Sequence, residues 1–357
     1  MSTNLRLYHT ILHQIRQWWP EERVTRQRNM ALLITGLFLA GRVHLSRIVG
    51  MWPSRSKAPS LVNRLRRFLG NSRLHVWEWY RPVAEQLLAL ASGPELHLII
   101  DCTKVGFAFR LMTVSLAYKR RSLPLVWSVH RGSRGWTSVQ AQQALLKRLL
   151  PLIPAQRSVV LLGDAGFQSV ELLGWLRRQG WHFVIRQQGK IQVYSPAFGW
   201  RRLDSFALEP GQTRVLGWVR LTRRRNVGWF WLVLHWEAGE DAPWYLASSR
   251  SGRGALIRLY KKRMWTEEMY GDWKGHGFDL EASHLRDPDR IDRLVLAVAL
   301  TFLWLIALGS VVVKRGQRHL VDHRSRRDKS YFRIGWDWTL RCLRLDEPVS
   351  FRLIPYP

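Results

Sequence analysis

The sequence predicts an α/β protein, a mixed β-sheet flanked by helices, with a helical segment before it. Two observations predict this fold class. From residue 93 onward, short β-branched apolar runs alternate with stretches of helical periodicity, whereas residues 1–92 show helical periodicity alone. The chain has 357 residues, of which 46% are hydrophobic, so it is long enough for two or three domains and can bury a sizeable core.

The charge of the chain limits the classes of partner. It carries 56 Lys and Arg against 26 Asp and Glu, a formal net charge of +30. An excess of this size predicts a polyanionic partner, with nucleic acid as the first candidate and an anionic membrane surface as the second. The cysteines, Cys102 and Cys342, are too few for a disulfide framework or a cysteine-based zinc site, and they suit a reducing compartment. No phosphate-binding loop of the P-loop type and no dinucleotide fingerprint occurs, so we expect no nucleotide cofactor.

The N-terminal segment, residues 1–92, has apolar positions at helical spacing in Leu5–Trp19, Met30–Leu39 and Val62–Leu69. Pro53 and Pro59 are expected to break the connection between the last two into helix, turn and helix. The final helix is rich in arginine, namely Arg64, Arg66 and Arg67. We therefore interpret this segment as a DNA-binding domain with a helix-turn-helix unit; the alternative is a helical bundle with a basic solvated face.

Two buried strands in the middle of the chain each end in an aspartate. LIID ends at Asp101 and LLGD ends at Asp164, and between them two apolar runs, near 111–118 and 123–130, are joined by a basic turn. The order strand, strand, strand, helix, strand, helix, strand predicts an antiparallel meander followed by helix-linked parallel strands. Acids at the carboxyl ends of neighbouring strands would repel each other unless a divalent cation lay between them; the alternative is that each acid only caps its strand.

A third acid lies in a segment that reads as one helix, Gly252–Trp273. Four side chains at offsets 0, 3, 7 and 14 would share one stripe of a helix, since 3.6 residues make a turn: Tyr260, Arg263, Glu267 and Lys274. A phenol, a guanidinium, a carboxylate and an ammonium on one stripe are suited to handling phosphate, with the carboxylate on a metal ion.

The spacing Y-x2-R-x3-E-x6-K in this stripe resembles the signature of the insertion-sequence-4 family of bacterial DDE transposases. The resemblance extends to the strands that carry Asp101 and Asp164. It implies an RNase H-like mixed sheet with an inserted β-rich subdomain. The expected segments are a helical DNA-binding domain at 1–92, a catalytic core at 93–189 and 251–315, the β-rich insertion at 190–250 and a basic C-terminal tail at 316–357. The tail shows no clear periodicity, so we expect it to be irregular.

The resemblance also implies roles for individual residues. Asp101, Asp164 and Glu267 would hold two Mg²⁺ or Mn²⁺ ions and catalyse phosphodiester hydrolysis at element ends and strand transfer into target DNA. Further residues would contact DNA, namely Tyr260, Arg263, Lys274, Arg186 and Trp265. Arg186 has a structural salt bridge as its alternative role, and Trp265 stands one place after the position where the family usually has an aromatic residue.

Three further expectations concern partners and location. The resemblance implies a homodimer on the DNA ends and a place in the bacterial cytoplasm, at the nucleoid. The run Leu294 to Val313 is uncharged and long enough to span a bilayer, but we interpret it as a buried helix and expect no membrane. The alternatives to a transposase are a nuclease of the same fold without strand transfer, a DNA-binding remnant without catalysis and a membrane-anchored basic protein.

Overall fold

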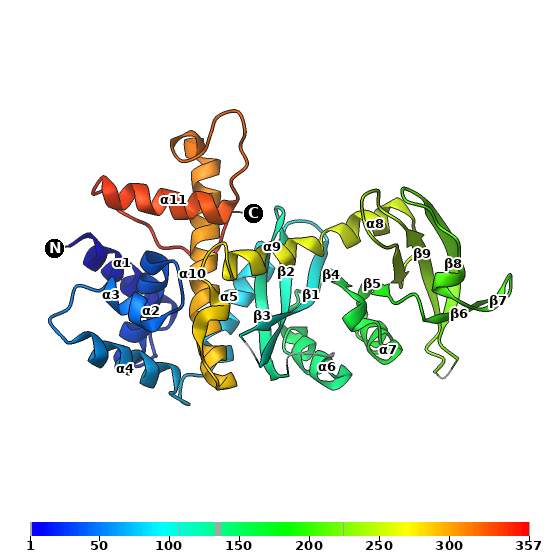
Figure 1. Ribbon diagram of the computed structural model, residues 1–357, viewed down its shortest axis with the longest axis horizontal. Coiled ribbons are helices and arrows are strands. Elements are labelled where there is room, and N and C mark those ends of the chain that lie inside the picture. Colours follow the sequence, from blue (N-terminus) through cyan, green and yellow to red (C-terminus); the bar gives the residue numbers. More distant parts are fainter. Residues whose placement is uncertain (1, 107, 133–136, 224, 357) are drawn as a thin grey trace.

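The computed structural model describes residues 2–106, 108–132, 137–223 and 225–356. The N-terminal helices form one end of the molecule, a long helix runs through its middle, and the sheet extends from there to the other end (Figure 1). The first five helices are α1 (Thr3–Trp18), α2 (Val24–Ala40), α3 (Leu45–Gly50), α4 (Ala58–Leu69) and α5 (Val76–Leu90).

The predicted helix, turn and helix are present as α3, residues 51–57 and α4, and the two helices pack against each other. The expected role of Pro59 as a helix breaker is wrong. Pro59 lies in the first turn of α4, where its missing N–H is not needed and its fixed φ favours the helix start. The apolar stripe of α4 is buried through Leu61, Leu65 and Phe68, which leaves its arginines on the other faces.

One sheet of ten strands runs through the rest of the molecule in the order β3-β2-β1-β4-β5-β10-β9-β8-β6-β7. Its first five strands are β1 (Glu95–Val105), β2 (Phe109–Tyr118), β3 (Arg121–Arg131), β4 (Ser158–Gly163) and β5 (His182–Gln187). Strands β1 to β3 pair antiparallel, while β4 pairs parallel with β1 and with β5. The predicted meander followed by helix-linked parallel strands is therefore confirmed.

The β-rich segment after β5 continues the same sheet. Its strands are β6 (Gln192–Ser195), β7 (Gly199–Arg202), β8 (Thr213–Leu221), β9 (Trp229–His235) and β10 (Trp244–Ser248). Strand β10 pairs antiparallel with β5 along Val184–Gln187, so the segment is attached to the edge of the five-stranded unit through backbone hydrogen bonds.

Helices cover both faces of the sheet. In Figure 1, α8 (Gly254–Lys261) and α9 (Met264–Trp273) lie above it, and α6 (Val139–Lys147) and α7 (Val170–Arg178) lie below it. Side chains alternate between the faces of a strand, so Ile99, Val160 and Val184 pack with α8 residues while their neighbours join the core on the other side. Both faces are buried, which explains why these strands read as continuous apolar runs.

The apolar run near the C-terminus forms the central helix α10 (Pro288–Lys314), as predicted for a buried helix. It is long and apolar enough to cross a membrane by composition, but 94% of its apolar window is buried inside the protein. The expectation of an irregular tail after it is wrong in part, because α11 (Tyr331–Arg344) packs across α10. The crossing is close: a Cβ on Gly335 would stand 1.9 Å from the backbone oxygen of Leu305.

Candidate active site

Strand alternation directs three predicted side chains to the face that α8 and α9 cover. Asp101 lies two residues after Ile99 on β1, Asp164 two residues after Leu162 at the end of β4, and Arg186 two residues after Val184 on β5. Strands β1, β4 and β5 are neighbours and run parallel, so their carboxyl ends meet at one edge.

These side chains line one open cavity of about 340 Å³ together with residues of α8 and α9. The cavity is lined by Asp101, Cys102, Thr103, Asp164, Ala165, Arg186, Tyr260, Arg263, Glu267 and Tyr270. Six of the predicted site residues thus meet, although they are far apart in the sequence. A concave site with converging acids and arginines can bind an anionic group beside a cation.

Asp101 is the most strongly perturbed acid of the cavity. Only 7% of the residue is exposed. Burial raises the pKa of Asp101 to about 7, Arg263 opposes this increase, and the charges of Asp164 and Glu267 add to it. The backbone N–H of Cys102 donates to Asp101 Oδ1 at 2.7 Å. An acid that is costly to ionise in this position gains from a nearby cation, and such perturbation is typical of functional sites.

Arg263 supplies that positive charge in the structure. Its Nη1 lies 3.2 Å from Asp101 Oδ2 and its Nη2 lies 2.5 Å from Glu267 Oε1. Burial opposes the charged form, but Tyr260 and the two carboxylates raise the pKa of Arg263 above its usual value. The Nε atom is buried without a hydrogen-bond partner among the described residues. Arg263 therefore links two of the three acids and keeps one donor unused.

The other acids are held differently. Asp164 begins a short 3₁₀ turn, and its Oδ1 accepts a hydrogen bond from the N–H of Gly166 at 2.8 Å. Glu267 stands on the exposed side of α9, with its side chain 50% exposed. Its carboxylate can therefore change rotamer at low cost, while the carboxylate of Asp101 is fixed by its surroundings.

The prediction of one continuous helix through the signature is wrong in part, because Lys262 and Arg263 keep helical φ and ψ angles while their backbone hydrogen bonds follow the i→i−3 pattern. The helix breaks at Lys262 and Arg263, so Tyr260 ends up in α8, Glu267 in α9 and Lys274 at the C-terminal cap of α9. Tyr260 is 1% exposed and packs edge-on against Trp244, with its pKa raised by burial. Lys274 does not line the cavity; its Nζ lies 2.9 Å from Glu281 Oε1. Tyr260, Arg263 and Glu267 therefore still share the cavity, and Lys274 is the one residue of the signature that lies outside it.

Of the two remaining residues predicted to contact DNA, Trp265 lies outside the cavity and Arg186 lines it. Trp265 is half-buried against the core under α8, where the Nζ of Lys262 lies 5.9 Å from its ring centroid, and it does not line the cavity. Arg186 does line it, and its Nη2 donates to the carbonyl of Pro243 at 3.2 Å. The alternative of a structural salt bridge for Arg186 has no counterpart among the ion pairs of the described residues.

Tyr270 supports the site, although no sequence pattern singled it out. The hydroxyl of Tyr270 donates to the backbone oxygen of Asp101 at 3.2 Å and lies 2.6 Å from the hydroxyl of Thr113, which pairs with Asp101 across the strands. Tyr270 is three residues after Glu267, so the helical spacing that links Tyr260 to Arg263 could have identified it. It fixes the part of β1 that carries Asp101. The prediction that this strand ends at Asp101 is wrong, because β1 continues to Val105 in its pairing with β2.

The carboxylates of Asp101, Asp164 and Glu267 are suitable ligands for a divalent cation, since Mg²⁺ and Mn²⁺ prefer carboxylate oxygens. In the part of the chain that the structure describes, no three acidic, histidine or cysteine side chains stand close enough to hold one ion as they are placed. Arg263 lies between Asp101 and Glu267 instead. The donor set fits a metal if this guanidinium moves aside.

Comparison with known proteins decides the family. A family model for the transposase DDE domain matches residues 94–304, more than half of the chain and all of the cavity. The chain belongs to the DDE transposase-domain family. Membership implies phosphoryl transfer on DNA, in a family that generally uses divalent metals. The strand order β3-β2-β1-β4-β5 with its helices is the RNase H-like arrangement of this domain, which confirms the predicted fold class.

A solved structure similar to this DDE transposase-domain protein is a piggyBac transposase synaptic complex with hairpin DNA, determined by cryo-EM. The two chains share 8% sequence identity, the match covers 97% of this chain and 80% of that one, and the TM-score is 0.46. No curated protein matches the sequence.

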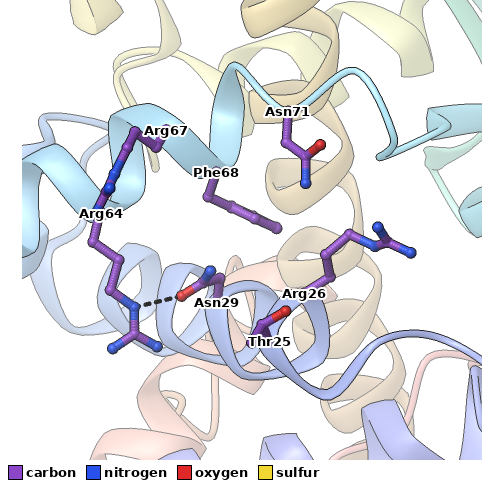
Figure 2. A pocket seen from close by; sticks show the side chains of 7 residues that line it. All are labelled: Thr25, Arg26, Asn29, Arg64, Arg67, Phe68 and Asn71. Carbon is purple, nitrogen blue, oxygen red and sulfur yellow. Dashed lines mark hydrogen bonds between the residues drawn. The ribbon is translucent and has the colours of Figure 1, made fainter.

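Two of the three predicted N-terminal arginines of this DDE transposase-domain protein, Arg64 and Arg67, lie at a cavity between α2 and α4. Figure 2 shows its lining, with Arg64 and Arg67 on α4 and Arg26 and Asn29 on α2. Arg64 Nε donates to Asn29 Oδ1 at 2.6 Å, which leaves the rest of its guanidinium available for an anion. Arg66 does not line the cavity and is exposed beside Asn63. The three arginines therefore face two different surfaces.

Proposed function

We propose that this protein is the transposase of a bacterial insertion sequence, which hydrolyses phosphodiester bonds at the ends of its element and joins those ends to target DNA. The observation that carries the proposal is the meeting of Asp101, Asp164 and Glu267 at one cavity beside Arg263. The family supports action on DNA, and the net charge of +30 suits a polyanionic substrate.

The three acids of the cavity and Tyr270 have different tasks in this proposal. Asp101, Asp164 and Glu267 would hold the divalent metal, which stabilises the charge of the attacking and leaving oxygens. Burial and the neighbouring acids keep the pKa of Asp101 near 7, so the ionised form that binds a cation predominates above neutral pH. Tyr270 holds the backbone of Asp101, which keeps the first carboxylate at a constant position.

Arg263 would act on the phosphate. Its buried Nε has no partner among the described residues, and its Nη atoms are held by the two carboxylates that a metal would take over. A guanidinium released from them can bind a DNA phosphate through two parallel hydrogen bonds. We propose that Arg263 neutralises the acids in the free protein and binds the phosphate beside the cut in the complex.

The proposal is tested by cleavage of DNA that carries the inverted repeats flanking the gene, in the presence of Mg²⁺. Glu267→Gln should abolish cutting and retain DNA binding, because it removes one metal ligand and leaves the surface unchanged in shape. The matched control is Glu171→Gln on α7, whose carboxylate pairs with Arg225 outside the cavity. The control should cut like the wild type. Equal cutting by Glu267→Gln would remove this residue from the active site.

Strand transfer separates a transposase from a nuclease of the same fold. Cut ends are incubated with a second, circular plasmid, and the joined product is recovered and sequenced. We expect joined ends, because a 3′-hydroxyl can replace water as the attacking group at the same site. Cutting without any joined product would support the nuclease instead.

A further inference from the structure

A further cleft, separate from the active-site cavity and from the cavity between α2 and α4, lies between the β2–β3 turn and the segment that connects α10 to α11. It has a volume of about 710 Å³, twice that of the active-site cavity. The connecting segment is the orange loop beyond the end of α10 in Figure 1.

Basic side chains from separate segments line this cleft. The turn contributes Lys119, Arg120 and Arg121, and the connecting segment contributes Arg318, Arg326, Arg327 and Lys329, against the acids Glu268 and Asp328. Some of these cations are already paired: Arg121 with Glu268, Arg318 with Asp322 and Lys329 with Asp337. The exposed side chains of Arg120, Arg326 and Arg327 form no ion pair in the described part of the chain. The cleft therefore keeps unneutralised guanidinium groups.

The conformation of the basic residues is a second, independent observation. Lys119 and Arg120 are the central residues of a two-residue hairpin turn, and their φ angles are 43° and 66°. Arg327 has a φ of 48°. Turns of this kind strongly favour Asn and Gly, because a positive φ is unfavourable for long side chains. Long basic residues at all three positions cost stability, which indicates that their side chains serve another purpose.

The partner that fits these features carries regularly spaced, exposed phosphates. Arginines bind phosphate through planar, paired hydrogen bonds, and several of them along one cleft suit the backbone of a nucleic acid better than a single small anion. The adjacent helix α9 links the cleft to the active site, since Glu267 faces the cavity while Glu268 lines the cleft. A DNA duplex bound at one is therefore near the other.

We propose that this cleft binds the phosphate backbone of duplex DNA next to the segment being cut, without reading its sequence. The inference rests on the proposed function in one respect, since it presupposes a chain that acts on DNA. The turn supplies contacts from the sheet, and residues 318–330 supply contacts from the C-terminal part. The residues that sequence analysis assigned to an irregular basic tail thus form half of a DNA-binding surface.

The test uses the full chain and a duplex of arbitrary sequence, with affinity measured over a series of salt concentrations. The first variant is Lys119→Asn/Arg120→Gly, which removes two cations and introduces the residues that the turn prefers. It should lower the slope of log affinity against log salt by about 2 and weaken binding about tenfold at moderate salt. Its melting temperature should stay the same or rise, by about 2 °C.

A second variant and a control complete the design. Arg326→Gln/Arg327→Asn removes two cations from the opposite side of the cleft, with Asn chosen because it tolerates a positive φ. Its salt slope should also fall by about 2. The control, Lys147→Gln/Arg178→Gln, removes two exposed cations from α6 and α7, below the sheet, and should bind like the wild type.

The outcomes are distinguishable. Weaker binding and a lower slope for both cleft variants, with a folded protein and an unaffected control, would support the cleft. Wild-type binding by the cleft variants, or an equal loss in the control, would overturn it while leaving the proposed function intact. A wild-type chain that does not bind duplex DNA even at low salt would overturn both.

Discussion

Replacement of Arg263 by glutamine should make the protein bind Mn²⁺ more tightly, although it should reduce DNA cutting. In the structure the guanidinium of Arg263 holds carboxylate oxygens of Asp101 and Glu267. A metal ion that binds these oxygens has to displace it. The variant removes this competitor and leaves both carboxylates in place. The metal ion then no longer has to break the ion pairs of Arg263, so its binding free energy becomes more favourable by that cost.

The magnitude follows from the distance and the exposure of the pair. Two unit charges 3.2 Å apart attract each other by about 5 kcal/mol at an effective dielectric constant of about 20. Part of this is offset by desolvation of the pair, and the contact with Glu267 is screened because that side chain is 50% exposed. We expect a net gain of about 1.5–3 kcal/mol, which is a roughly ten- to hundredfold lower dissociation constant for Mn²⁺.

The pH of the assay decides whether the gain is visible. Burial raises the pKa of Asp101 to about 7 and Arg263 lowers it, so the variant raises this pKa further. A proton then competes with the metal near neutral pH, and the full gain is expected only at about pH 8.5. Isothermal titration with Mn²⁺ measures the affinity. Arg186→Gln is the control, because Arg186 lines the same cavity but donates to the carbonyl of Pro243. Equal Mn²⁺ affinity in wild type and Arg263→Gln would refute the competition.

Two further predictions concern stability, measured by denaturant unfolding. Burial raises the pKa of Asp272 to about 7, so the folded state keeps a proton that the unfolded state has lost, and stability falls as pH rises towards 7. The free energy of unfolding of Asp272→Asn, relative to that of the wild type, should therefore rise by about 3 kcal/mol between about pH 5 and pH 8. A difference between the two proteins that does not change with pH would contradict the raised pKa. Gly335→Ala should destabilise by about 3 kcal/mol, because its Cβ would meet the backbone oxygen of Leu305 at 1.9 Å. Gly50→Ala, with open space around it, should change little, and an equal loss in both variants would contradict the close helix crossing.

The sheet and its two aspartates were predictable from local pattern. Buried strands are recognisable in the sequence as β-branched apolar runs. Alternation along a strand then determines on which face of the sheet each side chain lies. Once each acid is placed directly after its apolar run, the meeting of Asp101 and Asp164 follows from the parallel pairing of β1 with β4, in which Ile100 lies opposite Gly163. This part of the site needs no information beyond strand order.

The signature segment was not predictable in the same way. Neither Pro nor Gly marks the break at Lys262 and Arg263, and an uninterrupted helix satisfies the same spacing. Tertiary packing overrides the local preference, because Tyr260 is buried against Trp244 while Arg263 is drawn to Asp101. Lys274 shows the same limit, since its partner Glu281 lies outside the helix.

The C-terminal helix α11 shows a different limit. Its buried face includes Gly335, Thr339 and Cys342 beside the aromatic Phe332 and Trp336. Small and polar residues on this face weaken the apolar periodicity, so the sequence reads as an irregular tail. Their reason is visible only in the packed structure, where the helices cross with backbones in contact and larger side chains would not fit.

We propose that Asp101, Asp164 and Glu267 form one metal site. Titration of Mn²⁺ into the wild-type chain at about pH 8.5, repeated with Asp101→Asn, Asp164→Asn and Glu267→Gln, tests it directly. Each of the three substitutions should remove or strongly weaken Mn²⁺ binding, whereas Glu268→Gln on the same helix should bind like the wild type. Unchanged Mn²⁺ affinity in all three acid variants would contradict the claim.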